Sequence, residues 1–75
     1  MIKIDLHGHR HEEVKHLLER ILNSMWGSEE ELHIITGYSE RLQKIVVDIL
    51  RQYNLEYSIG DFSGRNMGYV RTVLE

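Results

Sequence analysis

The sequence contains neither cysteine nor proline, and its 75 residues include only one tryptophan and one phenylalanine. The absence of cysteine excludes disulfides and thiolate zinc sites, and it favours a reducing, cytoplasmic location. No run approaches the roughly 20 apolar residues that a membrane span needs, and the N-terminus has no apolar signal-peptide segment. We therefore expect a soluble cytoplasmic protein with no membrane partner.

Length and charge limit the kind of site that this chain can build. A domain of this size buries only about 60% of its unfolded surface, so we expect a single domain over residues 1–75 with a shallow surface site. Twelve acidic and nine basic residues give a net charge of -3, which argues against a general nucleic-acid binder. The acidic residues gather in the first predicted helix and the loop after it, which leaves room for a basic rim elsewhere. The residues of that rim are Arg10, Arg41, Lys44, Arg65 and Arg71.

The spacing of apolar residues predicts six elements in the order β-α-β-α-β-β. Apolar residues three and four positions apart predict helices over about 11–25 and from an N-cap at Ser39 to about residue 53. Alternating or β-branched stretches predict strands near 2–7, 31–37, 55–59 and 68–75. Two right-handed crossovers in the same direction place both helices on one face of the sheet. The predicted fold class is α+β, a two-layer sandwich with a four-stranded mixed sheet whose other face stays open.

A carboxylate and an imidazole lie two residues apart at the end of the first predicted strand, in the segment Ile4-Asp5-Leu6-His7-Gly8. Side chains alternate along a strand, so Asp5 and His7 share the face opposite the core. Gly8 allows a sharp turn into the first helix. Imidazole can accept or donate a proton near neutral pH, and a carboxylate can orient it. Asp5 and His7 are therefore the candidate catalytic residues.

A glycine loop, Thr36-Gly37-Tyr38-Ser39, separates the second predicted strand from the second helix. The free N–H groups at the start of a helix attract phosphate, and Arg41 and Lys44 follow within the first turns. Tyr38 is the aromatic residue best placed to stack on an unpaired base. Because the first two strands are expected to be neighbours, this anion site should lie close to Asp5 and His7.

These segments resemble the small MutS-related (Smr) domain family, whose hallmarks are a Leu-Asp-Leu-His-Gly motif and a later Thr/His-Gly-x-Gly motif. The first motif reads Ile-Asp-Leu-His-Gly at 4–8 here, and Glu12-Glu13-Val14 follows where the family commonly has Glu-Glu-Ala. The second motif begins with Thr36-Gly37, and residues 66–70 (Asn-Met-Gly-Tyr-Val) resemble the closing strand of the family. The resemblance covers nearly the whole chain.

The resemblance implies a fold like the C-terminal domain of translation initiation factor three, and an association with nicking or endonucleolytic cleavage of DNA or RNA. It assigns that activity to the positions of Asp5, His7 and Gly37. It also implies a protein partner such as the ribosome or the repair machinery. Ser39 differs from the family, because it stands where the second loop glycine is expected.

A metal site is a competing interpretation of the histidine-rich segment around His7, His9 and His11. The three residues fall on a strand end, a turn and a helix start, so their side chains should diverge, and their spacing matches no common zinc pattern. Glu12 and His16 are one helical turn apart, but a solvated helix face explains them better. We predict no metal and no other cofactor, and leave a divalent ion open.

The sequence thus favours a nucleic-acid-binding endonuclease with RNA preferred over DNA, because RNA supplies its own nucleophile whereas DNA cleavage usually needs metals on several carboxylates. The alternative is a non-catalytic module that binds nucleic acid or protein, which the replacement of the loop glycine by Ser39 favours. The predicted phosphate-binding residues are Gly8, Arg10, Thr36, Gly37, Tyr38, Ser39, Arg41, Lys44 and Arg65.

Overall fold

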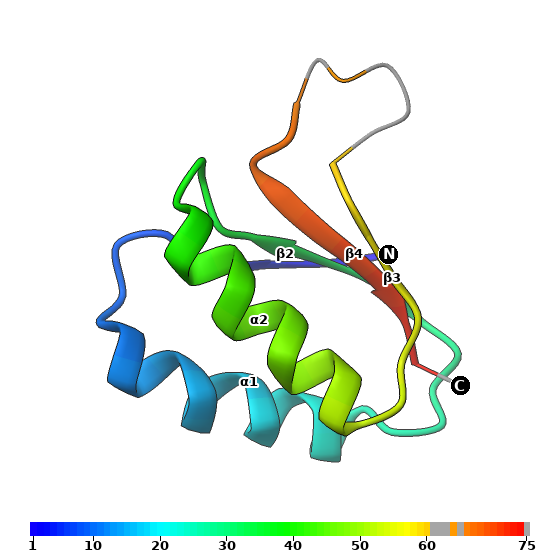
Figure 1. Ribbon diagram of the computed structural model, residues 1–75. Coiled ribbons are helices and arrows are strands. Elements are labelled where there is room, and N and C mark those ends of the chain that lie inside the picture. The colour runs from blue at the N-terminus through cyan, green and yellow to red at the C-terminus, as the bar shows by residue number, and fades with distance from the viewer. Residues whose placement is uncertain (61–63, 65, 75) are drawn as a thin grey trace.

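The computed structural model describes residues 1–60, 64 and 66–74 (Figure 1). The elements follow in the predicted order. They are β1 (Ile2–Asp5), α1 (His11–Ser24), β2 (Glu31–Ile35), α2 (Glu40–Gln52), β3 (Tyr57–Ile59) and β4 (Tyr69–Val73). In the part of the chain described, no helix is both long and apolar enough to cross a membrane.

The four strands form one mixed sheet in the order β1-β2-β4-β3. β1 and β2 are parallel, and β4 runs antiparallel to both of its neighbours, β2 and β3. The last strand of the sequence is therefore inserted between the second and the third. Figure 1 shows α1 and α2 side by side on one face of this sheet, which confirms the predicted α+β class and its two layers.

The core lies between the helices and the sheet. In β1 the half-buried Ile2 and Ile4 alternate with the exposed Lys3 and Asp5, as the sequence pattern predicts. The helices and the inner strands complete the core with fully buried side chains, among them Leu18, Leu22, Leu32, Ile34, Val46, Leu50 and Val70. The face of the sheet away from the helices carries mostly polar and aromatic side chains, among them Lys3, His33, Tyr69 and Arg71, together with Ile35 and Val73.

The third strand is shorter than predicted because the end of α2 occupies the residues before it. The N–H of Leu55 donates to the carbonyl of Leu50, and the N–H of Asn54 donates to that of Arg51. Asn54 has a positive φ of 57°, so these residues form a Schellman motif that closes the helix. Leu55 then packs into the core, and pairing with β4 begins only at Tyr57.

Ser39 is the N-cap of α2, as predicted. Its backbone is extended, with φ −75° and ψ 107°, and its hydroxyl oxygen accepts a hydrogen bond of 3.2 Å from the N–H of Leu42. Any residue can adopt this backbone conformation, so the position does not demand glycine. The capping bond shows how a serine at this position supports the start of α2.

Substitution of Ser39 should show whether the start of α2 is stabilised by the side-chain capping bond or only by the extended backbone at this position. Ser39→Ala removes the acceptor and should lower the free energy of unfolding by about 1 kcal/mol, whereas Ser39→Gly should cost only a few tenths. Urea denaturation monitored by circular dichroism measures both variants. Ser24→Ala is the control, because its hydroxyl donates to the Ile21 carbonyl at the exposed end of α1. Equal losses for Ser39→Ala and Ser24→Ala would contradict a specific capping role.

Candidate functional site

Three loops meet at one end of the sheet, where the strands begin or end. The parallel strands β1 and β2 end there, and β4 begins there, because Asp5 is in register with Ile35 and Ile35 with Tyr69. The loops after β1 and β2 therefore lie beside the residues that precede β4. This arrangement brings the two glycine-containing segments of the sequence together, as predicted for neighbouring parallel strands.

His7 lies directly against Gly37. Gly37 has a positive φ of 65°, and a Cβ atom added there would lie 3.2 Å from Cδ2 of the His7 ring. Glycine is therefore favoured for two reasons, its left-handed backbone and the close approach of the imidazole. The His7 side chain of the first loop thus sits at the second loop, immediately before the start of α2.

Asp5 acts on the backbone of His7. One carboxylate oxygen, Oδ1, accepts a hydrogen bond of 2.9 Å from the N–H of His7. The turn continues with a 3.1 Å bond from the N–H of His9 to the carbonyl of Leu6, and Gly8 supplies a positive φ of 88°. The His7 ring itself makes no hydrogen bond with any described residue. Asp5 therefore fixes the turn that carries the imidazole, rather than the ring nitrogens.

The carbonyl of Gly68 holds the end of β2. It accepts the N–H groups of both Thr36 and Gly37, each at 2.9 Å, and the Thr36 hydroxyl lies 3.3 Å away. Thr36 is only 1% exposed. Its predicted contact with phosphate is therefore not available in this structure, because its amide and hydroxyl hydrogens are already used inside the protein. The N–H of Gly37 is occupied in the same way.

The next four amides are differently placed. The N–H groups of Tyr38, Ser39, Glu40 and Arg41 have no hydrogen-bond partner among the described residues, because the first bonded amide of the turn is that of Leu42. These groups lie at the start of α2, where the helix dipole favours an anion. Tyr38 and Ser39 are exposed. The part of the loop open to a phosphate thus begins one residue later than Gly37.

Arg10 and Arg41, two residues of the predicted basic rim, lie near each other. Both line one shallow hollow, together with His9, His11 and Glu12. Arg10 is 3.9 Å from Glu12 but four-fifths exposed, so this contact contributes little. Lys44 is exposed one helical turn after Arg41. Arg65 lies outside the described residues.

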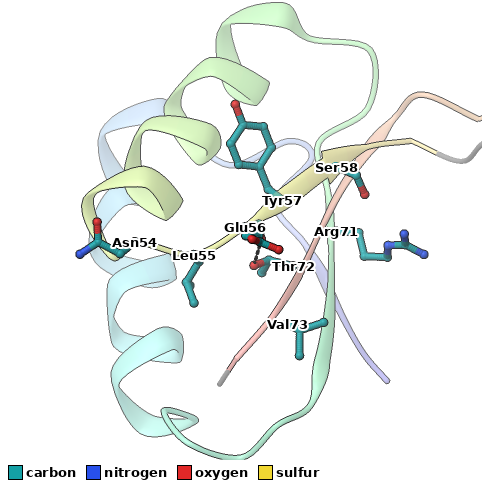
Figure 2. Close-up of a pocket in the computed structure, with 8 residues that line it drawn as sticks. All are labelled: Asn54, Leu55, Glu56, Tyr57, Ser58, Arg71, Thr72 and Val73. Atoms are coloured by element: carbon teal, nitrogen blue, oxygen red, sulfur yellow. Dashed lines mark hydrogen bonds between the residues drawn. The ribbon is translucent and has the colours of Figure 1, made fainter.

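Arg71 is not part of that hollow. Its Nε is 3.3 Å from Oε1 of Glu31, and it is in register with His33 on the open face of the sheet. Figure 2 shows the side chains of Arg71 and Ser58 pointing away from the helices. The hollow drawn there, beside the edge strand β3, includes Arg71 but none of the predicted catalytic or phosphate-binding residues.

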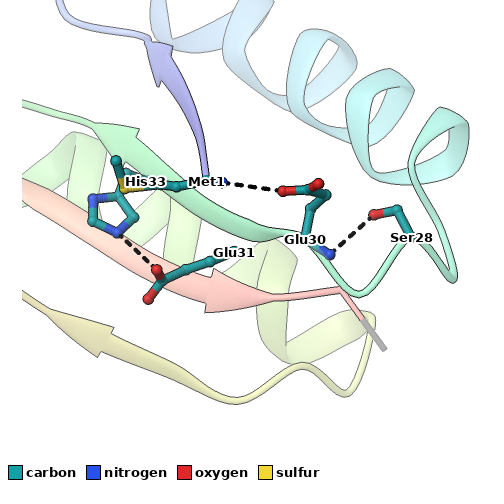
Figure 3. A network of polar contacts seen from close by, with 5 residues as sticks. All are labelled: Met1, Ser28, Glu30, Glu31 and His33. Carbon is teal, nitrogen blue, oxygen red and sulfur yellow. Dashed lines mark hydrogen bonds and ion pairs between the residues drawn. The ribbon is translucent and has the colours of Figure 1, made fainter.

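The open face carries a second set of polar contacts. Oε2 of Glu31 lies 3.6 Å from Nε2 of His33, and the Met1 amino group is 3.1 Å from Glu30 (Figure 3). The rings of His33 and Tyr69 stack with centroids 5.0 Å apart and planes 12° from parallel. Nε2 of His33 is shielded from solvent and has no hydrogen-bond partner in the described structure.

Two residues that hold the loops together were missed in the sequence. The side-chain amide of Gln43 donates to the carbonyls of Gly37 and Met67, at 3.3 and 2.8 Å, and so ties the β2–α2 loop to the segment before β4. The side chain of Asn66 accepts the N–H of Gly68 at 3.0 Å. Only the position of Gln43 on the first turn of α2 hinted at such a role. Within the described ranges, no group of three or more histidine or acidic side chains is placed to hold a metal ion.

The fold is a two-layer α+β domain in which both helices cover one face of a mixed sheet. The loops that meet at one end of this sheet form a candidate anion site at the start of α2. The sequence model of the Smr domain matches residues 4–70, and the chain therefore belongs to the Smr domain family. It is also similar to the crystal structure of a human small-MutS related domain. The TM-score is 0.72 at 22% identity, over 96% of this chain and 99% of that one. No curated protein sequence matches significantly.

Replacing Gly37 should disturb His7 beyond the strain of the backbone. Gly37→Ala places a methyl group against the imidazole, and a left-handed alanine costs roughly 1–2 kcal/mol. We expect a similar loss of stability in Gly27→Ala, where φ is 80° but an added Cβ meets nothing within 4 Å. The His7 ring resonances in NMR spectra should shift only in Gly37→Ala. Unmoved His7 resonances in that variant would show that the two residues are not in contact.

Proposed function

We propose that this Smr domain binds nucleic acid at the joined loops and cleaves RNA there. The observation that carries the proposal is the His7 imidazole lying against Gly37, one residue before the unpaired amides at the start of α2. A proton-transfer group and an anion-binding backbone thus lie side by side. The membership of the chain in the Smr family supports the same class of function.

A phosphate would be held by backbone first and by side chains second. The amides of Tyr38 to Arg41 can donate to its oxygens, and the guanidinium groups of Arg10 and Arg41 line the adjoining hollow. Arg41 and Lys44 are on the exposed side of the same helix. This local positive group accounts for phosphate binding by a chain whose net charge is -3.

The chemical step uses the nucleophile of the substrate. The His7 ring accepts the proton of a ribose 2′-hydroxyl as the 2′-oxygen attacks the neighbouring phosphorus. The bond from phosphorus to the 5′-oxygen breaks, and that oxygen takes a proton from solvent water, while the His7 imidazolium returns its proton to solvent. The products are a 2′,3′-cyclic phosphate and a 5′-hydroxyl. Asp5 keeps the His7 turn in place through the backbone bond and is in that sense a positioning residue.

RNA is favoured over DNA because this route needs no activated water. Hydrolysis of DNA usually relies on water that is bound to metal ions held by several carboxylates. Next to His7 the structure places a single carboxylate, that of Asp5, in hydrogen-bond contact with the described loop. A non-catalytic binding module is the second candidate. It is favoured by the bond of Asp5 to the backbone rather than to the imidazole, and by Ser39 at the position of the second motif glycine.

Removing single charges should reveal the phosphate contacts. Arg41→Gln and Lys44→Gln should each weaken RNA binding, and each lost contact should reduce the slope of log K against log salt by about 0.7 on a single strand. Arg51→Gln is the matched control, because Arg51 is exposed in the last turn of the same helix. Fluorescence anisotropy over a range of salt concentrations gives the slopes. If all three variants have the wild-type slope, these side chains make no phosphate contact.

The cleavage mechanism is tested on end-labelled RNA and DNA with and without chelator. We expect RNA products with 2′,3′-cyclic phosphate and 5′-hydroxyl ends, formed in the presence of chelator. His7→Ala should lower the rate by about 100- to 10,000-fold, as loss of a general acid or base does. Asp5→Asn should impair cleavage without unfolding the protein. Chelator-sensitive cleavage that leaves 5′-phosphate ends would contradict the mechanism.

Ser39→Gly separates the two candidate functions. It restores the family glycine at a position where the backbone tolerates either residue. If wild type binds RNA without cleaving it and Ser39→Gly cleaves, then Ser39 has converted the site into a binding module. Binding without cleavage by both proteins would support a non-catalytic module whatever residue occupies position 39.

A further inference from the structure

A groove on the open face of the sheet begins at the candidate site. Its floor consists of His33, Ile35 and Tyr69 from the two central strands, and Lys3 of β1 and Asn66 lie along its sides. Its volume is about 420 Å³, within the range of small-molecule sites. No helix in the described part of the chain covers this face, since α1 and α2 are both on the other (Figure 1).

The groove is continuous with the loops that meet at His7. Gly37 and Tyr38 line it, and Gly37 is also the residue against which the His7 ring rests. A strand whose phosphate is held at the start of α2 can therefore place its next nucleotide in the groove without leaving the protein surface. The strand register supports this path from the loops to the groove. Asp5, two residues before His7, lies in one row across the sheet with Ile35 and Tyr69, which line the groove.

The groove has the chemistry of a stacking platform. His33 and Tyr69 already form a nearly parallel pair, so their rings are held in place before a ligand arrives. Tyr38 is 73% exposed at the mouth of the groove, where its ring has an open face. Flat aromatic surfaces with a nearby cation suit unpaired bases, because every base has a π-face and the Lys3 ammonium can approach a phosphate. A base-paired duplex keeps its bases turned inward and cannot use such a floor.

We infer that this groove binds an unpaired base next to the phosphate at His7, so that the domain recognises single-stranded rather than duplex nucleic acid. The inference rests on the proposed function, since the phosphate site anchors the strand. The base stacks on Tyr38 at the groove mouth and lies over the floor made by His33, Ile35 and Tyr69. Binding is tolerant of sequence, because stacking rather than hydrogen bonding supplies most of the contact.

The test compares a short labelled single-stranded RNA, an abasic strand of the same length and an RNA duplex by fluorescence anisotropy. Wild type should bind the RNA strand more tightly than the abasic strand or the duplex. Tyr38→Ala should weaken binding of the RNA strand by roughly 5- to 150-fold, with little effect on the abasic strand. Tyr38→Phe retains the ring and should bind as wild type does. Tyr57→Ala is the control, because Tyr57 is an exposed tyrosine outside the groove.

The outcomes separate this inference from the function on which it rests. Equal binding of the RNA and abasic strands, unchanged by Tyr38→Ala, would overturn the base site and leave the phosphate site intact. Tighter binding of the duplex would overturn it as well. No binding of any of the three would overturn the proposed function itself. NMR shifts at the amides of Ile35 and Tyr69, caused by the RNA strand but not by the abasic strand, would support the groove.

Discussion

The hydrogen bonds to the Gly68 carbonyl are the constraint on which the functional edge depends. One oxygen accepts two consecutive amides from the end of β2 and lies within reach of the Thr36 hydroxyl. This contact ends the pairing of β2. It holds Gly37 in the left-handed conformation at which the His7 ring lies close to its Cα atom. The amides that follow Gly37 are then at the start of α2. Gln43 reinforces it from the helix side by binding carbonyls in both loops. The loop against which the imidazole lies is therefore held by Gly68, the residue directly before β4, which is distant from His7 in the sequence.

The elements were predictable because their signals are local. Apolar spacing placed α1 and α2 within a residue or two of their observed ends, and the preference of serine for N-caps identified Ser39. The strand ends were less accurate for physical reasons. Asn54 and Leu55 complete a Schellman motif before β3 begins, and Thr36 leaves the ladder to bind Gly68. Both effects depend on hydrogen bonds that an alternating pattern does not encode.

The proximity of the candidate residues was predictable, but their hydrogen bonds were not. Neighbouring parallel strands brought Asp5, His7 and Gly37 to one edge, as strand polarity requires. The same argument could not foresee that Asp5 would bind a backbone amide, that Thr36 would be buried, or that Arg71 would pair with Glu31. The Asp5 bond is a local turn that an alternating pattern does not encode, whereas the other two features depend on the placement of β4 beside β2, which follows from tertiary packing. The stacked pair of His33 and Tyr69 escaped prediction for the same reason.

The insertion of the last strand into the middle of the sheet has a consequence for synthesis on the ribosome. Until β4 has emerged, β3 lacks its only neighbour in the sheet order and β2 has an unpaired inner edge. The β1-α1-β2-α2 portion can form its parallel pair early, but an open strand edge of this kind invites pairing with other chains. The sheet can close only after the chain has been released through about Leu74, which is buried in the core. The loops around His7 can therefore reach their final arrangement only once β4 is available to pair with β2 and β3.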